Sequence, residues 1–103
     1  MNFMIYNDWG FALVKQKKYK KAIKKLKKAI EINPNHAYAY NNWGNALFKQ
    51  KKYKEAIEQF KKNIERNPNN ADAYYNWGWA LEAMGKPKEA KKIFKKAEQL
   101  IKK

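Results

Sequence analysis

Residues 37–70 read AYAYNNWGNALFKQKKYKEAIEQFKKNIERNPNN, and this stretch decides the fold because it recurs on both sides of itself. Its segment Trp43-Gly44-x-Ala46-Leu47 is preceded by Trp9-Gly10-x-Ala12-Leu13 and followed by Trp77-Gly78-x-Ala80-Leu81. The three glycines follow one another at a constant interval of 34 residues. A period of this length is typical of proteins built from stacked repeats.

The composition limits the class of protein. A chain of 103 residues with 45% hydrophobic content is long enough for one domain with a core, and we expect a single repeat domain over residues 1–103. The absence of cysteine excludes disulfides and thiolate metal sites. No apolar run approaches the roughly 18 residues of a membrane span, and no secretory signal is visible. We therefore expect a cytoplasmic protein without a cofactor.

Each repeat is predicted to form two amphipathic helices. We place the first helices at about 3–16, 37–50 and 71–84, and the second helices at about 20–32, 53–66 and 87–101. Pro34 and Pro68 separate the repeats, because proline lacks the N–H group and restricts the residue before it. Gly85 suits a left-handed turn in the third hairpin, whereas Lys17 and Lys51 adopt that conformation at some cost.

Small and large residues recur at fixed positions of each predicted hairpin. Glycine stands where the two helices would approach most closely, and large side chains should fill the space between them. The large residues are Trp9, Trp43, Trp77, Leu26, Phe60 and Phe94. One hairpin cannot cover both of its apolar faces, but a stack of three can. The predicted fold is therefore all-α, with three stacked helix-turn-helix repeats forming a short right-handed α-solenoid.

This spacing resembles the tetratricopeptide repeat, with three repeats at about 3–36, 37–70 and 71–103. In the middle repeat, the positions of the family pattern hold Tyr40, Trp43-Gly44, Leu47, Ala56, Phe60 and Pro68. Asn63 departs from the pattern, since the other repeats have alanine there, and we expect it to disturb packing between the second and third repeats. Without the polar helix that usually follows the last repeat, Ile93, Leu100 and Ile101 should be partly uncovered and should favour a homo-oligomer.

The resemblance implies a scaffold that binds a protein or peptide in a concave groove lined by the first helices. Asparagine both donates and accepts hydrogen bonds, so a ladder of amides can hold an extended peptide backbone. Asn42 and Asn76 stand where some members of the family carry such a ladder. The expected groove residues are Asn7, Asn41, Asn42, Asn45, Phe48, Lys49, Tyr75, Asn76 and Trp79. The alternative is that these amides are ordinary solvated helix surface.

Two of the groove aromatics, Phe48 and Trp79, are expected to be exposed and to act as anchors for a ligand. Other members of the family grip the C-terminal carboxylate of chaperones with a clamp of lysine, asparagine and arginine. Asp72 stands at one position of that clamp, and its negative charge predicts that this chain does not bind such tails.

The lysine-rich second helix of the first repeat supports an alternative function. The chain has a net charge of +15, and the lysines of residues 17–28 fall together on the helix face opposite the apolar residues. Like charges one turn apart destabilise a helix by a few tenths of a kcal/mol, a cost that a polyanion site would explain. Binding of RNA or DNA phosphates is thus the second hypothesis. The lysines that would contribute are Lys17, Lys20, Lys21, Lys24, Lys25 and Lys28.

Two plainer explanations stay open. The charge could reflect a general compositional bias, and the chain could be a fragment or an engineered array without a ligand of its own. Catalysis has little support, because the one histidine, His36, lies beside a proline turn and no cluster of metal ligands accompanies it. We expect His36 to cap a helix, and we expect the protein not to be an enzyme.

Overall fold

The computed structural model describes residues 2–102, and these residues form six α-helices and no strand. The helices are α1 (Phe3–Lys15), α2 (Tyr19–Ile32), α3 (Ala37–Lys49), α4 (Tyr53–Arg66), α5 (Ala71–Ala83) and α6 (Pro87–Ile101). The predicted bounds are confirmed to within one residue. The first helix of each repeat ends one residue early because Gln16, Gln50 and Met84 serve as C-caps.

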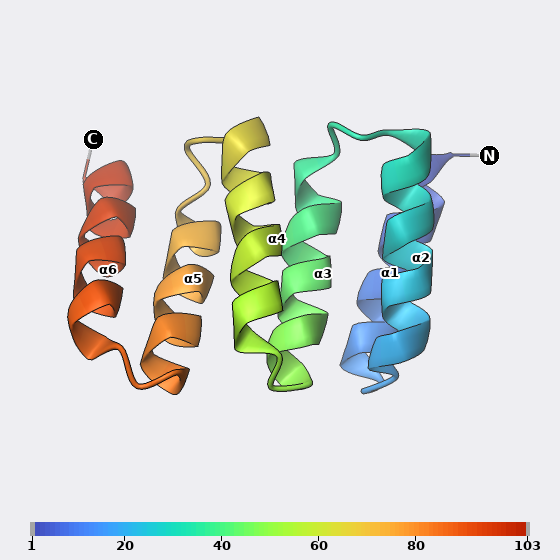
Figure 1. Cartoon of the computed structure of the whole chain (residues 1–103). Coiled ribbons are helices and arrows are strands. Elements are labelled where there is room, and N and C mark those ends of the chain that lie inside the picture. The colour runs from blue at the N-terminus through green and yellow to red at the C-terminus, as the bar shows by residue number, and fades with distance from the viewer. Residues whose placement is uncertain (1, 103) are drawn as a thin grey trace.

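The helices form three antiparallel hairpins that stand side by side (Figure 1). Each second helix packs against the first helix of the next repeat, α2 on α3 and α4 on α5. The first helices also contact one another, α1 with α3 and α3 with α5, whereas the second helices have no such mutual contact within residues 2–102. The stack therefore curves, with the first helices on its concave side, as expected for a helical repeat solenoid.

The turns within the hairpins have the predicted left-handed residues. Lys17, Lys51 and Gly85 have φ values of 64°, 65° and 77°. In each turn the next residue donates its backbone N–H to the carbonyl of Leu13, Leu47 or Leu81, at 2.9 Å in each case. Glycine adopts this conformation without strain, so the two lysines make the first two turns the strained ones.

The glycines of the repeated Trp-Gly motif lie at the closest approach of the two helices, as predicted. A Cβ atom added at Gly10 would lie 2.6 Å from Leu26 Cγ, and one at Gly44 or Gly78 would overlap the ring of Phe60 or Phe94. Phe60 is completely buried. The pairing of a glycine with a large residue thus sets the spacing within every hairpin.

Asn63 does not disturb the packing between the second and third repeats, so that expectation was wrong. Its side chain is fully buried, and its Nδ2 donates to the carbonyl of Ala37 at 2.6 Å. Its Oδ1 accepts from Asn70 Nδ2 at 3.0 Å. Because buried polar groups are tolerated when their hydrogen bonds are made, Asn63 ties the turns before α3 and α5 to α4.

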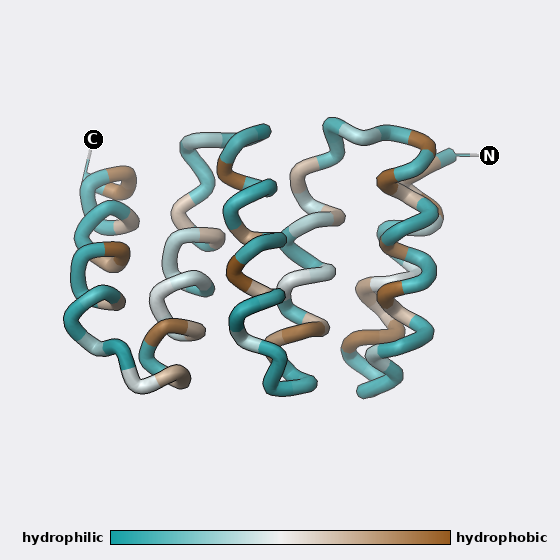
Figure 2. Tube along the Cα trace, in the orientation of Figure 1, coloured by the Kyte–Doolittle hydropathy of each residue, from teal (hydrophilic) through white to brown (hydrophobic). Residues whose placement is uncertain are grey.

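The last helix is covered better than its sequence indicated. Each of α2, α4 and α6 has an apolar side that faces the stack and a hydrophilic side that faces outward (Figure 2). Ile93 was expected to be partly uncovered, but it is buried in a cluster with Ile57, Ala80 and Leu81. Leu100 is partly exposed, and Ile101 is 63% exposed as predicted. Self-association through this helix stays a prediction.

The contact of Gly44 with Phe60 leads to a test of the packing. The change Gly44→Ala should lower the free energy of unfolding by about 1–2 kcal/mol, measured by urea denaturation, because the buried ring cannot move away from the new methyl group. Helix propensity alone would give the opposite sign, a gain of about 1 kcal/mol. Lys51→Gly serves as the control and should raise stability, since it removes strain at a positive φ. A gain for Gly44→Ala would contradict the close-packing explanation.

Candidate peptide-binding groove

The concave side of the stack is formed by α1, α3 and α5, whose mutual contacts place their inner faces next to one another. The predicted groove residues come from these three helices. Asn7 lies on α1, a larger group lies on α3, and Tyr75, Asn76 and Trp79 lie on α5. The α3 group consists of Asn41, Asn42, Asn45, Phe48 and Lys49.

Two hydrogen-bonded asparagine pairs connect the three first helices. Asn42 Nδ2 donates to Asn7 Oδ1 at 2.9 Å, and Asn76 Nδ2 donates to Asn41 Oδ1 at 3.2 Å. Both pairs join residues 35 positions apart, so they are the same interaction moved by one repeat. Each amide in a pair keeps donor or acceptor capacity, because a primary amide offers two N–H groups and an oxygen with two lone pairs.

Aromatic side chains are exposed at both ends of this face. Trp79 is 51% exposed, as predicted, and its ring centroid lies 6.2 Å from that of Tyr75. Phe11 on α1 is also exposed, and the Lys15 ammonium group lies 4.7 Å from its ring centroid.

Phe48 is not an exposed anchor, which corrects the prediction. It is partly buried, packs against the core clusters on both sides, and meets Tyr53 edge-on with a centroid distance of 5.2 Å. The sequence could not show this, because Phe48 lies between the second and third hairpins. Its main contribution is therefore to packing.

Charged side chains are exposed on all three helices of the concave side. Lys15 and Lys49 are exposed at the C-terminal ends of α1 and α3. Asp72 and Glu82 are exposed on α5, at its two ends. The third repeat thus contributes only carboxylates to this side, whereas the first two contribute Lys15 and Lys49 together with Asp8, which is exposed on α1 at the position equivalent to Asn42.

His36 lies just before α3, beside this face, and is partly buried next to two aromatic rings. It takes the N-cap position, which confirms the prediction that it caps a helix, although its side chain makes no cap hydrogen bond. Its ring lies 4.8 Å from that of Phe3 and 6.2 Å from that of Tyr38. Burial lowers the pKa of His36 below the ordinary 6.5, and the charge of Asp8 offsets part of this effect.

The lysine face of α2 lies on the outer side of the stack. Lys17, Lys20, Lys21, Lys24 and Lys28 are exposed there as expected. Lys25 is partly buried instead, with its ammonium group 3.8 Å from the ring centroid of Trp9. Trp9 was expected to fill the core but is 48% exposed. An exposed aromatic residue therefore lies next to the lysines, which the linear sequence does not show.

Residues 2–102 do not form a recognisable metal site or a membrane-spanning helix. No three histidine, cysteine, aspartate or glutamate residues there gather to hold a metal ion. None of the helices formed by the same residues combines the length and the apolar character needed to cross a bilayer.

Comparison with known families agrees with this architecture. The sequence matches the TPR repeat family over residues 10–51 and 44–85, and the Tetratricopeptide repeat family over residues 71–103. These matches span most of the chain, which therefore belongs to the tetratricopeptide-repeat family. None of the curated proteins compared with the chain matches it significantly.

Several solved structures resemble the chain closely. A crystal structure of MamA shares 32% sequence identity and superposes with a TM-score of 0.94, covering 98% of this chain and 59% of its own. A second MamA structure, from MSR-1, gives 31% identity, a TM-score of 0.89 and coverages of 98% and 58%. This chain thus spans less than two thirds of either MamA chain.

A third structure contains a ligand. The second TPR of Spaghetti (RPAP3), bound to the HSP90 peptide SRMEEVD, shares 27% identity with a TM-score of 0.90. The superposition covers 97% of this chain and 93% of that one.

The partial burial of His36 predicts that the stability of the fold depends on pH. Because the folded pKa is lowered, the unfolded chain binds more protons between the folded pKa and 6.5. The stabilisation is therefore complete above pH 6.5 and is lost as the pH falls through the folded pKa. Urea denaturation between pH 7.5 and 5.5 should show this decrease, and His36→Gln should flatten it. An equally steep decrease in the variant would assign the effect to other groups.

Proposed function

We propose that this chain is a non-catalytic, cytoplasmic scaffold that binds a segment of a protein or a peptide along its concave groove. The observation that supports the proposal most is the juxtaposition of a line of amides on α1, α3 and α5 with the half-exposed ring of Trp79. The peptide-bound TPR of Spaghetti has the same fold, which supports this class of ligand.

The amides would serve the backbone of an extended segment. Asn7, Asn41, Asn42 and Asn76 already hold one another in place through their pair bonds, so little side-chain entropy is lost when their remaining groups bind a ligand. Such bonds give affinity without reading sequence. Trp79, with Tyr75 beside it, would supply the apolar anchor.

The charges along the groove favour one orientation of the ligand. An acidic part of the segment would lie near Lys15 and Lys49, and a basic part near Asp72 and Glu82. Asp72 also argues against binding a chaperone tail as the clamp of related proteins does, because a C-terminal carboxylate would be repelled there. The ligand class we propose is therefore an internal or extended segment with charges of both signs.

The second candidate function is binding of RNA or DNA through α2. It is favoured by the exposed lysines of α2 and of the turn before it, within a chain of net charge +15. Phosphate contacts of this kind are independent of sequence and weaken steeply with salt.

Variants of the two faces should separate the two functions. The probe for the groove is a fluorescent peptide selected from a random displayed library on the wild-type chain. Trp79→Ala should weaken its binding about tenfold or more, since anchors of this kind contribute about 2 kcal/mol. Asn42→Ala should weaken it by about two- to tenfold through the loss of one hydrogen bond. Fluorescence anisotropy measures both changes.

The matched control carries Lys21→Glu, Lys24→Glu and Lys28→Glu on the outer side. This variant should keep the peptide affinity and lose binding of a fluorescent single-stranded oligonucleotide, measured across a salt series. If every selected peptide bound Trp79→Ala and Asn42→Ala as tightly as the wild type, the groove would not be the site.

A further inference from the structure

One face of α1 is exposed, although the equivalent faces of α3 and α5 are covered by α2 and α4. We call it the α1 end face and define it by Ile5, Trp9 and Ala12. Ile5 is 53% and Trp9 48% exposed, and Ala12 is exposed as well. The equivalent alanines of α3 and α5 are all 0% exposed, because α2 covers α3 and α4 covers α5. These alanines are Ala39, Ala46, Ala73 and Ala80.

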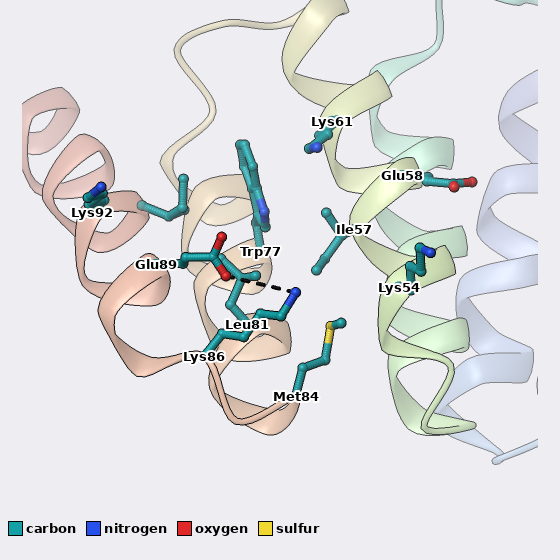
Figure 3. Close-up of a pocket in the computed structure, with 11 residues that line it drawn as sticks. Lys54, Ile57, Glu58, Lys61, Trp77, Leu81, Met84, Lys86, Glu89 and Lys92 are labelled. Carbon is teal, nitrogen blue, oxygen red and sulfur yellow. Dashed lines mark ion pairs between the residues drawn. The ribbon is translucent and has the colours of Figure 1, made fainter.

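The two covered faces show what kind of helix fits there. On α5, Ile57 of α4 packs against Ala80 and Leu81, and the Lys61 ammonium group lies 5.0 Å from the ring centroid of Trp77 (Figure 3). On α3, Ile23 and Lys27 of α2 take the same places, with Lys27 5.4 Å from the ring centroid of Trp43. The fitting partner is thus an amphipathic helix with an apolar side chain over the alanines.

The edge of each covered face carries charges of both signs. Around Trp77, the edge formed by Lys86, Glu89 and Lys92 of α6 lines one cavity with Lys54, Glu58 and Lys61 of α4 (Figure 3). Around Trp43, Lys52, Glu55 and Glu58 of α4 share a cavity with Lys20, Lys24 and Lys27 of α2. Each edge therefore offers at least one carboxylate to the helix that covers it.

The edge of the α1 end face is entirely cationic. The positions equivalent to Lys86, Glu89 and Lys92 are Lys18, Lys21 and Lys24. They line a cavity of about 400 Å³ together with Trp9, Leu13 and Lys25. Lys25 also supplies, from the same hairpin, the cation that covers the tryptophan ring. A helix that docked here would therefore meet four ammonium groups and need no lysine of its own.

We propose that the α1 end face binds an acidic amphipathic helix of another polypeptide. That helix would carry isoleucine or leucine at the place of Ile57, with carboxylates at the places of Lys54, Glu58 and Lys61. Its pattern is Glu-x-x-Ile-Glu-x-x-Glu, in which aspartate can replace glutamate. The apolar residue would cover Trp9 and Ala12, and the carboxylates would pair with the lysine edge. This surface is separate from the concave groove, so the proposal does not depend on the function of the groove.

A second copy of the chain does not fit this face. Head-to-tail stacking would place α6 on α1, and α6 carries lysine at all the critical positions. These are Lys88, Lys91, Lys92 and Lys95, where α2 has Lys20, Ile23, Lys24 and Lys27. Two-fold pairing of α1 end faces would instead bring Lys18, Lys21 and Lys24 against their own copies. Both arrangements set like charges together in a chain of net charge +15.

The test uses two labelled peptides and the whole chain. The acidic probe is the α4 sequence, residues 53–66, with Lys54→Glu and Lys61→Glu; the basic control is the α2 sequence, residues 19–32. Isolated helices of this length are marginal in water, so both peptides are acetylated and amidated and are titrated to about 1 mM at low salt. We expect the acidic peptide to bind at least about tenfold more tightly by anisotropy, and salt to weaken it. No binding of the acidic peptide, or equal binding of both, would overturn the proposal.

Variants of the chain locate the binding. Ile5→Asp and Trp9→Ala should each weaken binding of the acidic peptide about tenfold or more, whereas Trp79→Ala, an equally exposed tryptophan on the concave side, should leave it unchanged. The change Lys18→Glu with Lys21→Glu and Lys24→Glu should reverse the preference toward the basic peptide. This reversal is a gain, so a misfolded variant cannot imitate it; circular dichroism checks the fold of the others.

Other occupants of the face give distinct results. An acidic peptide that single-stranded DNA displaced, and that bound Ile5→Asp and Trp9→Ala as tightly as the wild type, would show that the lysines act alone. A dimer in sedimentation experiments that Ile5→Asp converts to a monomer would show that a second copy occupies the face. Either result would overturn the proposal.

Discussion

The structure depends on the covering of each first helix by the second helix of the preceding repeat. At these contacts the alanines of α3 and α5 lose all exposure, and a lysine ammonium group lies over each tryptophan ring. A single hairpin leaves this face open, so no repeat reaches its full burial alone. The contact combines apolar burial with a cation–π interaction of about 0.5–1 kcal/mol, and it fixes the direction in which the repeats follow one another.

The groove is a consequence of the same stacking. Because glycine faces a large residue inside every hairpin, the two helices of a repeat lie close together and form one rigid layer. Successive layers then meet through their first helices, where asparagine pairs join α1 to α3 and α3 to α5. These hydrogen bonds hold the inner faces in line, so the residues that could contact a ligand are placed by the interactions that assemble the stack.

The sequence predicted the helices well because equivalent positions have equivalent neighbours. Glycine and the apolar period appear in every repeat and the repeat-ending proline in the first two, so each helix limit is supported two or three times. The prediction failed where neighbours differ. Trp9 has the same motif as Trp43, but no second helix within residues 2–102 covers it as α2 covers α3, and Phe48 is held between two hairpins. Asn63 finds its partners in Ala37 and Asn70, which only the assembled fold brings to it.

The candidate sites were harder to predict for the same physical reason. Helical periodicity placed asparagines and Trp79 on an inner face, but the pairing of Asn42 with Asn7 depends on the distance between two repeats. Likewise, the sequence assigned Lys21 and Lys24 to an outer lysine face, and only the fold brings them, with Lys18, beside the uncovered Trp9.

The two ends of the stack differ in chemistry, and this difference gives the array a direction. At the C-terminal end, exposed Lys91 and Glu98 stand where α2 and α4 have isoleucines, so the outer face of α6 is polar at the positions that elsewhere cover the next repeat. At the other end, Ile5 and Trp9 keep the apolar character of a stacking face, bordered by lysines. A polar face resists further stacking, whereas an apolar face with a charged edge selects its partner by sign as well as by shape. The α1 end face can therefore select a binding partner by charge and shape, whereas the polar outer face of α6 offers no such apolar contact.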